Sequence, residues 1–411
     1  MLTVVATLGA GLSAGVIAST AISGRAGGSR GPPTGAPLAH HRSISTKNVP
    51  GAHPVTVPVR PTTSVTASRI ATSVSGGSAP APTAATPRLS DPKALGQLIV
   101  TSFTGVSATG STLSAIQAGQ VGGIILFADN TAGGVGATRV LVQQLQTAAR
   151  DGGNPGLLIM TDQEGGEVKR LPGPPDRPAA QMSALAVAAT EGAETAVLLR
   201  AAGVNVDLAP VADVAAVDGF MEQEQRTFGT QPAVVASAAC AFARALRAGG
   251  VAYTLKHFPG LGDAYTSTDS GPVEITESAA GIRADDLAYR RCGAGDRALV
   301  MISSASYDNL TGSMPAVLSP NIYTSVLPAD GVTAITISDD FQTAAITSQP
   351  TPALRAITAG LDLLVYPESE AGAESAYEGL LVDLRDGALS PQRVQSAATR
   401  VLALKRSLGL R

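Results

Sequence analysis

The chain has little of the residue types from which many functional sites are built. It contains no tryptophan, two cysteines and four histidines among 411 residues, and only 3% of its residues are aromatic. Two cysteines cannot form a disulfide framework and four histidines leave little for a metal cluster, which excludes zinc ribbons, iron–sulfur proteins and knottin-like scaffolds. No acidic residue stands at metal-ligand spacing with a histidine or cysteine, so the sequence indicates no metal and no other cofactor.

Acidic residues are absent from the first 90 positions. Residues 1–90 contain seven arginine or lysine residues and no aspartate or glutamate. The formal net charge of the whole chain is -3, so residues 91–411 carry -10, with 22 basic and 32 acidic residues. A domain of this charge repels nucleic acid and anionic membrane surfaces, and we therefore expect no nucleic-acid partner.

The composition of the N-terminal part predicts two segments. Residues 2–22 are apolar or small and uncharged, so residues 1–24 are predicted to be a signal peptide or a membrane anchor. A positively charged start is missing, because the first arginine is Arg25, and the sequence leaves open whether this segment is cleaved or retained. Residues 25–90 are rich in Pro, Ser, Thr and Ala and contain no aromatic residue, which predicts a disordered linker. The protein is therefore expected to be extracytoplasmic, either secreted or membrane-anchored.

Residues 91–411 are predicted to form a (β/α)₈ barrel. Eight short, almost continuously apolar runs occur in this region, and most are separated by a helical pattern such as Leu141, Leu145 and Ala148. Eight buried strands alternating with helices are typical of that barrel, and a doubly wound open sheet is the alternative. The runs are Leu98–Val100, Gly123–Phe127, Leu157–Thr161, Val206–Ala209, Val251–Leu255, Leu299–Ile302, Thr333–Ile337 and Leu361–Val365.

The last helix has the clearest local signals. Ser390 is in position to cap it, Pro391 fits its first turn, and Gly409 follows its end. An apolar stripe runs along it at helical spacing. The stripe consists of Val394, Ala397, Val401, Leu404 and Leu408. The residues in excess of a minimal barrel fall mainly after the third, fifth and sixth predicted strands, where active-site loops of this architecture grow.

Charged residues follow several of the predicted strands. In a barrel the strands end at one face, where active sites lie, so we expect these side chains to surround a binding site. Each carboxylate could instead cap the next helix or pair with a neighbouring cation. The residues are Asp162, Asp213, Lys256, His257, Asp339 and Asp340.

The motifs around these positions resemble those of glycoside hydrolase family 3, and within it the single-domain β-N-acetylhexosaminidases. The resemblance runs from about Asp91 to the end of the chain. It implies a (β/α)₈ barrel that hydrolyses glycosides and needs no cofactor. The motifs are Gly123-Ile-Ile-Leu-Phe127, Thr161-Asp-Gln-Glu-Gly-Gly166 with Arg170, Leu208-Ala-Pro-Val-Ala-Asp213, Arg226-Thr-Phe-Gly229, Lys256-His-Phe-Pro-Gly260 and Ile337-Ser-Asp-Asp340.

The resemblance assigns roles to the matching residues. Asp339 corresponds to the nucleophile, which would form a covalent glycosyl-enzyme in a retaining mechanism, and Asp340 to its less critical neighbour. A further set corresponds to the residues that hold the terminal sugar through charge-assisted hydrogen bonds. That set is Asp162, Arg170, Arg226, Lys256 and His257.

The sequence departs from the family at the general acid/base. The family carries an Asp-Ser-His triplet on the loop after Lys-His-Phe-Pro-Gly, whose histidine is the acid/base, and this chain has Asp269-Ser270-Gly271 there. The other histidines are His40, His41 and His53 in the predicted linker and His257 at the sugar-binding position. No other imidazole in the predicted domain could protonate the leaving group, and loss of a general acid costs about 10²- to 10⁴-fold in rate.

A carboxyl group on the same loop could replace the histidine. Asp269 is the first candidate, with Asp263 and Glu274 as others, provided that burial keeps the group protonated. Asp269 could equally be a turn or cap residue in a flexible loop. The sequence thus predicts a retaining hydrolase that removes a terminal β-linked N-acetylhexosamine or glucose-like sugar, with cell-wall fragments as one possible source. A catalytically impaired sugar-binding protein of the same fold is the alternative.

The two cysteines fall in helical patterns. Cys240 and Cys292 could be buried thiols or, in an exported protein, one disulfide, and the sequence leaves both open.

Overall fold

The computed structural model describes residues 89–410. The predicted export segment 1–24, and the predicted linker 25–90 apart from Leu89 and Ser90, lie outside the described residues. Within residues 89–410, no helix combines the length and the apolar character that a membrane crossing requires.

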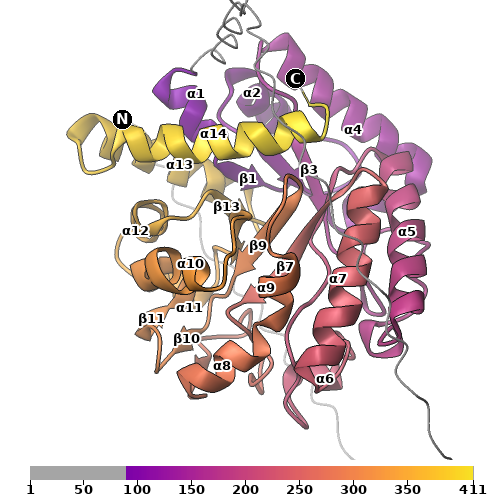
Figure 1. Ribbon diagram of the computed structural model, residues 1–411. Helices are drawn as coiled ribbons and strands as arrows, with labels where there is room; N and C mark the ends of the chain where they lie inside the picture. Colours follow the sequence, from indigo (N-terminus) through magenta and orange to yellow (C-terminus); the bar gives the residue numbers. More distant parts are fainter. Residues whose placement is uncertain (1–88, 411) are drawn as a thin grey trace, which may run out of the picture. The chain divides into compact units, whose positions relative to one another are not determined.

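Eight parallel strands close into a barrel (Figure 1). They follow one another around it in chain order, and the first pairs with the last through Ile99 and Leu364. Each overlaps one of the eight predicted runs, which confirms the (β/α)₈ prediction, and the closure excludes an open doubly wound sheet. The strands are β1 (Ile99–Thr101), β2 (Gly123–Ile125), β3 (Leu158–Thr161), β6 (Val206–Asp207), β7 (Ala252–Phe258), β9 (Ala298–Ile302), β12 (Ile335–Asp340) and β13 (Leu363–Tyr366).

Both faces of the strands are buried because neighbouring residues on a strand point to opposite sides. Val100 and Met160 belong to the apolar cluster that the strands share inside the barrel. Their neighbours Ile99 and Ile159 belong to the larger cluster that packs against the helices. This double burial explains why the strands appear in the sequence as continuous apolar runs.

Helices surround the barrel on its outside (Figure 1). The predicted stripe Leu141, Leu145 and Ala148 lies on the buried side of α4. The principal helices are α1 (Asp91–Gly96), α2 (Gly110–Ala118), α4 (Gly134–Asp151), α5 (Leu185–Ala202), α7 (Pro232–Ala248), α9 (Leu287–Cys292), α12 (Pro352–Ala359), α13 (Glu370–Asp386) and α14 (Pro391–Ser407).

Shorter elements occupy the loops that follow the strands. β4 (Gln163–Gly165) and β5 (Val168–Lys169) form a hairpin after β3. A small sheet after β7 and β9 consists of β8 (Glu274–Ile275), β10 (Ser306–Tyr307) and β11 (Gly312–Pro315). The remaining helical turns are α3 (Ala128–Thr131), η1 (Ala179–Gln181), α6 (Phe220–Gln223), α8 (Ala279–Asp285), η2 (Ala316–Leu318), the π-helix η3 (Ile322–Val326), α10 (Leu327–Ala329) and α11 (Ala344–Thr347). The predicted enlargement of the loops after the third, fifth and sixth strands is confirmed.

Helix α14 covers the end of the barrel at which the strands begin. The Ser390 side chain accepts a hydrogen bond from the Arg393 N–H, as the predicted cap requires. Val401 and Leu404 join the cluster inside the barrel, and Arg297, which precedes β9, donates to the Ser407 carbonyl oxygen. Figure 1 shows this helix, in yellow, lying across that end. The opposite end, where the strands finish, is therefore the one left for a site.

Two strands extend further than their apolar runs predicted. β7 continues through Lys256, His257 and Phe258, and β12 includes Asp339 and Asp340. Where the strand ends reach the polar cavity their residues are no longer apolar, although the backbone still pairs with the neighbouring strands. The Phe258 carbonyl oxygen, for example, still accepts from the Ser303 N–H at 2.9 Å.

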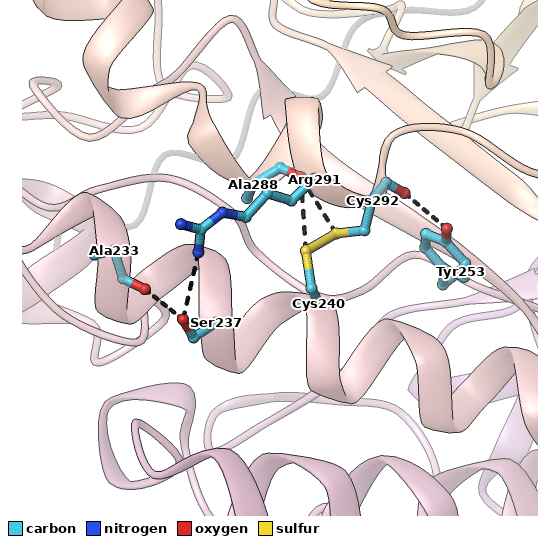
Figure 2. Close-up of a disulfide and its surroundings, with 7 residues drawn as sticks. All are labelled: Ala233, Ser237, Cys240, Tyr253, Ala288, Arg291 and Cys292. Atoms are coloured by element: carbon cyan, nitrogen blue, oxygen red, sulfur yellow. Dashed lines mark hydrogen bonds between the residues drawn. A yellow bond between two sulfur atoms is a disulfide. The ribbon is translucent and has the colours of Figure 1, made fainter. Parts of the chain in front are cut away.

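A disulfide joins α7 to the end of α9. Cys240 and Cys292 are bonded, with their Cα atoms 5.8 Å apart, which decides between the two alternatives that the sequence left open (Figure 2). The Tyr253 hydroxyl on β7 donates to the Cys292 carbonyl oxygen at 2.7 Å. The bond thus fixes α9 beside the strand that carries Lys256 and His257.

We predict that replacing both cysteines by serine lowers the free energy of unfolding by about 2–4 kcal/mol, because the cross-link closes a loop between residues 52 positions apart. Urea unfolding of the oxidised protein, the reduced protein and the double variant measures this. The reduced protein and the variant should have the same lowered midpoint. Equal midpoints for all three would show that the bond contributes nothing.

Candidate active site

A cavity of about 510 Å³ lies at the end of the barrel where the strands finish. It is lined by residues from the strand ends and from the loops that follow them. All seven predicted catalytic and sugar-binding residues line it, together with Asp340. The seven are Asp162, Arg170, Arg226, Lys256, His257, Asp269 and Asp339. The structure therefore brings them together, while their individual roles stay predictions.

Four charged groups form a buried network on one wall of the cavity. The Lys256 ammonium lies 2.6 Å from an Asp162 oxygen and 2.7 Å from a Glu164 oxygen. The Arg226 guanidinium donates two parallel hydrogen bonds to Glu164, each 2.9 Å long. The side chains of Lys256 and Glu164 are only 3% and 2% exposed, so these pairs are shielded from solvent.

The network sets the charge state of its members. Burial alone would raise the pKa of Glu164, but the charges of Lys256 and Arg226 and their hydrogen bonds lower it to about 2. Burial acts to lower the pKa of Lys256, and the charges of Asp162 and Glu164 outweigh it and raise the pKa. The cavity wall therefore keeps a fixed, ionised set of donors and acceptors for the hydroxyl groups of a ligand.

His257 is held in one orientation by Asp213. Its Nδ1 lies 2.8 Å from one Asp213 oxygen, and the other oxygen accepts from the backbone N–H groups of His257 and Leu261 at 2.9 and 2.8 Å. Asp213 thus binds the backbone and the Nδ1 atom of His257, and Nε2 is the ring nitrogen left to contact a ligand.

Asp339 stands at the end of β12 with its carboxylate available to a ligand. One of its oxygens accepts from the Asp340 N–H at 2.9 Å. No side chain within residues 89–410 forms a hydrogen bond or an ion pair with it. This contrasts with Asp162 and Glu164, whose oxygens are bound by Lys256. A carboxylate that no cation binds has oxygens free to act as a nucleophile.

Two further carboxyl groups face Asp339. Asp269 is exposed at the cavity, but partial desolvation raises the pKa of its carboxyl, and the charge of Asp339 raises it further. Burial also raises the pKa of Asp340 to about 7 against the opposing hydrogen bond from the Gln342 N–H, and Asp339 adds to the rise. Both groups therefore keep a proton at a higher pH than an ordinary aspartate does.

The other two acid/base candidates lie away from this cavity. Asp263 lines a separate small pocket with Glu277 and Asp285. Glu274 is exposed on β8 and interacts with Asp308. Among the three loop carboxyls that the sequence offered, the structure brings only Asp269 to Asp339.

Sequence reasoning did not single out Glu164, the carboxylate that joins Lys256 to Arg226. A signal for it existed. Residues 162 and 164 are two positions apart, and on extended chain such residues share a face. The three cations predicted at the site, Arg170, Arg226 and Lys256, also need carboxylate partners where they are buried. Phe127 received no role either, although its ring lies 5.6 Å beneath the Arg170 guanidinium as a cation–π partner.

No cluster of His, Cys, Asp and Glu in the described part of the chain is arranged to hold a metal ion.

Comparison with known proteins gives concordant results. Residues 92–404 match the family described as Glycosyl hydrolase family 3 N terminal domain. The chain is 32% identical to an uncharacterized secreted glycosyl hydrolase of Arthroderma benhamiae, over 76% of this chain and 92% of that protein. It resembles the structure of a β-N-acetylhexosaminidase of Beutenbergia cavernae, with a TM-score of 0.68 and 33% identity over 77% of this chain and 99% of that one. It also resembles the structure of a family 3 β-N-acetylglucosaminidase of a Paenibacillus species, with a TM-score of 0.72 and 28% identity. That match covers 78% of this chain and 63% of the other, longer chain.

We predict that Glu164→Gln destabilises the fold in a pH-dependent way. A carboxyl whose pKa falls from 4.5 to about 2 on folding stabilises the protein above pH 4.5 by about 3 kcal/mol, and this contribution disappears as the pH falls toward 2. The difference in unfolding free energy between wild type and variant should therefore be largest at pH 7 and shrink at pH 3.5.

Urea unfolding at pH 7, 5 and 3.5 measures this difference. Glu378→Gln, which removes an exposed glutamate of α13, serves as the control and should match wild type at each pH. A Glu164→Gln difference that stays constant with pH would contradict the charge network.

Proposed function

Because the chain belongs to glycoside hydrolase family 3, we propose that it removes a terminal β-linked N-acetylhexosamine from a glycoside with retention of configuration. The observation that carries this proposal is the pairing of Asp339 with Asp269 in one cavity. Asp339 has a carboxylate that no cation binds, and Asp269 has a pKa raised first by partial desolvation and then by Asp339. Retaining hydrolysis uses two carboxyl groups, one as the nucleophile and one as the acid. The sugar is suggested by the Beutenbergia and Paenibacillus proteins, which are named for N-acetylhexosamine substrates.

The terminal sugar would be held by the buried charge network. Asp162 presents oxygen acceptors and Lys256 an ammonium donor, and Arg170 adds a guanidinium whose Nε has no protein partner among the described residues. His257 can contribute Nε2. Charge-assisted hydrogen bonds from fixed groups bind hydroxyls and orient the anomeric carbon for attack.

The reaction would proceed in two displacements. An Asp339 oxygen forms a bond to the anomeric carbon as the glycosidic C–O bond breaks, and the Asp269 carboxyl gives its proton to the departing oxygen. A water molecule then enters, Asp269 takes one of its protons, and the water oxygen bonds to the anomeric carbon as the bond to Asp339 breaks. The products are the free sugar and its leaving alcohol, and both aspartates return to their starting states.

Asp269 suits the role of acid better than Asp340. Asp340 follows Asp339 directly in the chain, and one of its oxygens already accepts from the Gln342 N–H at 2.7 Å. Asp269 comes from the loop after β7, separated from β12 by β9 in the barrel order. A carboxyl on a different loop can reach the sugar from another side than the nucleophile does, as acid assistance requires.

One observation favours a second candidate function. His257 is the single histidine in residues 89–410, and its Nδ1 is bound to Asp213. A protein that binds the terminal sugar but protonates the leaving group poorly is consistent with this arrangement. Such a protein would still cleave aryl glycosides whose leaving group needs no acid.

We further propose that the protein acts outside the cytoplasm. The Cys240–Cys292 disulfide supports this, because such bonds persist in oxidising compartments. The Arthroderma relative is described as secreted. Residues 2–22 would supply the export signal or a membrane anchor, and fragments of a cell wall would be accessible substrates there.

We predict that Asp339→Ala lowers kcat for an activated aryl N-acetyl-β-hexosaminide by several orders of magnitude, because the covalent intermediate can no longer form. Steady-state assays of released aryl alcohol measure this. Binding of the free sugar by calorimetry serves as the folding control and should persist. Equal release by wild type and variant would refute the hydrolase mechanism.

We predict that Asp269→Asn lowers kcat/KM for an unactivated disaccharide by about 10²- to 10⁴-fold and leaves activated aryl glycosides much less affected. Since the acid acts only while protonated, wild-type kcat/KM for the disaccharide should fall as the pH rises through the raised pKa of Asp269, and the variant should lack this fall. Pairs of pH–rate profiles measure both effects.

Asp263→Asn is the matched control for this experiment, because Asp263 belongs to the same loop but lines another pocket. It should behave as wild type. If Asp269→Asn affected both substrate classes equally, Asp269 would be removed from the mechanism. If Asp340→Asn abolished the fall with pH instead, the acid would be Asp340.

A further inference from the structure

Gln163 has a buried side chain whose hydrogen bonds all go to one neighbouring loop. Its amide nitrogen donates to the carbonyl oxygens of Leu171 and Pro174, both at 2.9 Å. Its amide oxygen accepts from the backbone N–H groups of Arg170 and Leu171 at 3.1 and 3.0 Å. The residue is 0% exposed. A side-chain amide has two donor hydrogens and two acceptor positions, and all four are used here.

The loop that Gln163 binds contains few backbone donors of its own. The strand β5 ends at Lys169, and no helix or strand follows before residue 179. Three of residues 171–175 are proline, and proline has no N–H for a backbone hydrogen bond. The Gln163 side chain thus supplies this loop with hydrogen bonds that a strand would obtain from its neighbour.

Arg170 is the first residue of this loop, and it lines the active-site cavity. Its Nε is buried without a partner, and its guanidinium forms no ion pair within residues 89–410. Phe127 contacts the guanidinium through its ring. Because no carboxylate fixes the charged group, its place depends on the backbone of Arg170. Gln163 binds the N–H of that backbone, and the Thr131 hydroxyl donates to its carbonyl oxygen.

Gln163 also stands between two members of the charge network. Asp162 and Glu164, its neighbours in the chain, both contact Lys256. On extended chain the residue between two such neighbours points to the opposite side, and the loop lies there. The Gln163 N–H donates to the buried Asp207 carboxyl at 3.1 Å, which joins the segment to β6. One short segment therefore carries the network on one face and the backbone of Arg170 on the other.

We propose that Gln163 is a positioning residue for sugar binding, which holds Arg170 at a fixed place relative to the charge network so that one sugar can bind both. This rests on the proposed function, in which Arg170 and the network hold the terminal sugar. Gln163 is not part of the cavity lining, and it touches neither the sugar nor the reacting atoms. Its effect therefore appears in sugar affinity and in KM rather than in bond breaking.

The test compares Gln163→Ala with the matched control Gln146→Ala. Gln146 on α4 also binds backbone with its side chain, because it donates to the Leu157 carbonyl oxygen and accepts from the Leu157 N–H, both at 2.9 Å. Leu157 precedes β3 at the end of the barrel away from the cavity. Hydrogen exchange with mass spectrometry reports on the amides of residues 170–174, and calorimetry measures the affinity for N-acetylglucosamine. KM and kcat are measured with an aryl N-acetyl-β-hexosaminide.

Gln163→Ala should speed exchange of the Arg170 and Leu171 amides and weaken N-acetylglucosamine binding about tenfold to hundredfold, because a misplaced guanidinium loses a charge-assisted hydrogen bond. KM should rise far more than kcat falls. Gln146→Ala should lower the urea midpoint but leave exchange at residues 170–174, affinity and KM as in wild type. Unchanged affinity in Gln163→Ala, or an equal loss in both variants, would overturn the positioning role.

Gln163→Glu keeps the shape of the side chain and makes its hydrogen bonding depend on pH. A protonated carboxyl can still donate one hydrogen bond and accept others, and burial favours this form. An ionised carboxylate would place negative charge against the carbonyl oxygens of Leu171 and Pro174. The affinity of this variant relative to wild type should therefore be close to one at pH 5 and fall as the pH rises to 8. A ratio that stays constant with pH would contradict the contacts on which the proposal rests.

The same measurements separate this proposal from the proposed function. If wild type cleaves the aryl glycoside and the affinity for sugar does not respond to Gln163→Ala, only the positioning role fails. If sugar affinity responds as expected but no glycoside is cleaved, the positioning role stands and the hydrolase mechanism fails. If wild type neither binds the sugar nor cleaves the glycoside, both fail.

Discussion

The buried contact of Lys256 with Asp162 and Glu164 is the interaction on which the site depends. These groups come from β7 and from the chain that follows β3, and Arg226 joins them from a third segment. A buried ammonium without partners would lose its proton, and a buried carboxylate without partners would gain one. Together Lys256, Glu164 and Arg226 remain ionised, and the contacts fix the relative positions of the three segments. A rigid wall of charges on a barrel rim can orient a sugar without further reorganisation.

The rest of the fold keeps that wall in place. Asp213 fixes both the backbone and the ring of His257, directly beside Lys256. On the outer side of β7, Tyr253 bonds to the carbonyl oxygen of Cys292, whose disulfide joins α9 to α7. The strand that carries the central cation is thus held from the cavity side and from the helix side. Asp339 and Asp269 line the same cavity as this wall, and desolvation followed by the charge of Asp339 raises the pKa of Asp269.

Much of this arrangement could be predicted from the sequence, because strands buried on both faces leave continuous apolar runs. The barrel, the final helix and the grouping of Asp162, Lys256 and Asp339 at one end all follow from that pattern and from the family motifs. Apolarity could not show that β7 and β12 continue into charged residues, because paired charges replace apolar contacts there. The choice of Asp269 over Asp263, and the bond between Cys240 and Cys292, depend on how loops and helices approach in space, which residue spacing does not encode.

The central claim is that Asp339 bonds covalently to the anomeric carbon of the terminal sugar. A fluorinated glycosyl donor with a good leaving group tests it most directly, because fluorine destabilises the oxocarbenium-like transition state and a good leaving group still allows the intermediate to accumulate. Proteolysis and mass spectrometry then locate the sugar. The account predicts one label, on Asp339, formed together with release of the leaving group. A label on Asp340 or Asp269, or turnover of substrate without any label, would contradict it.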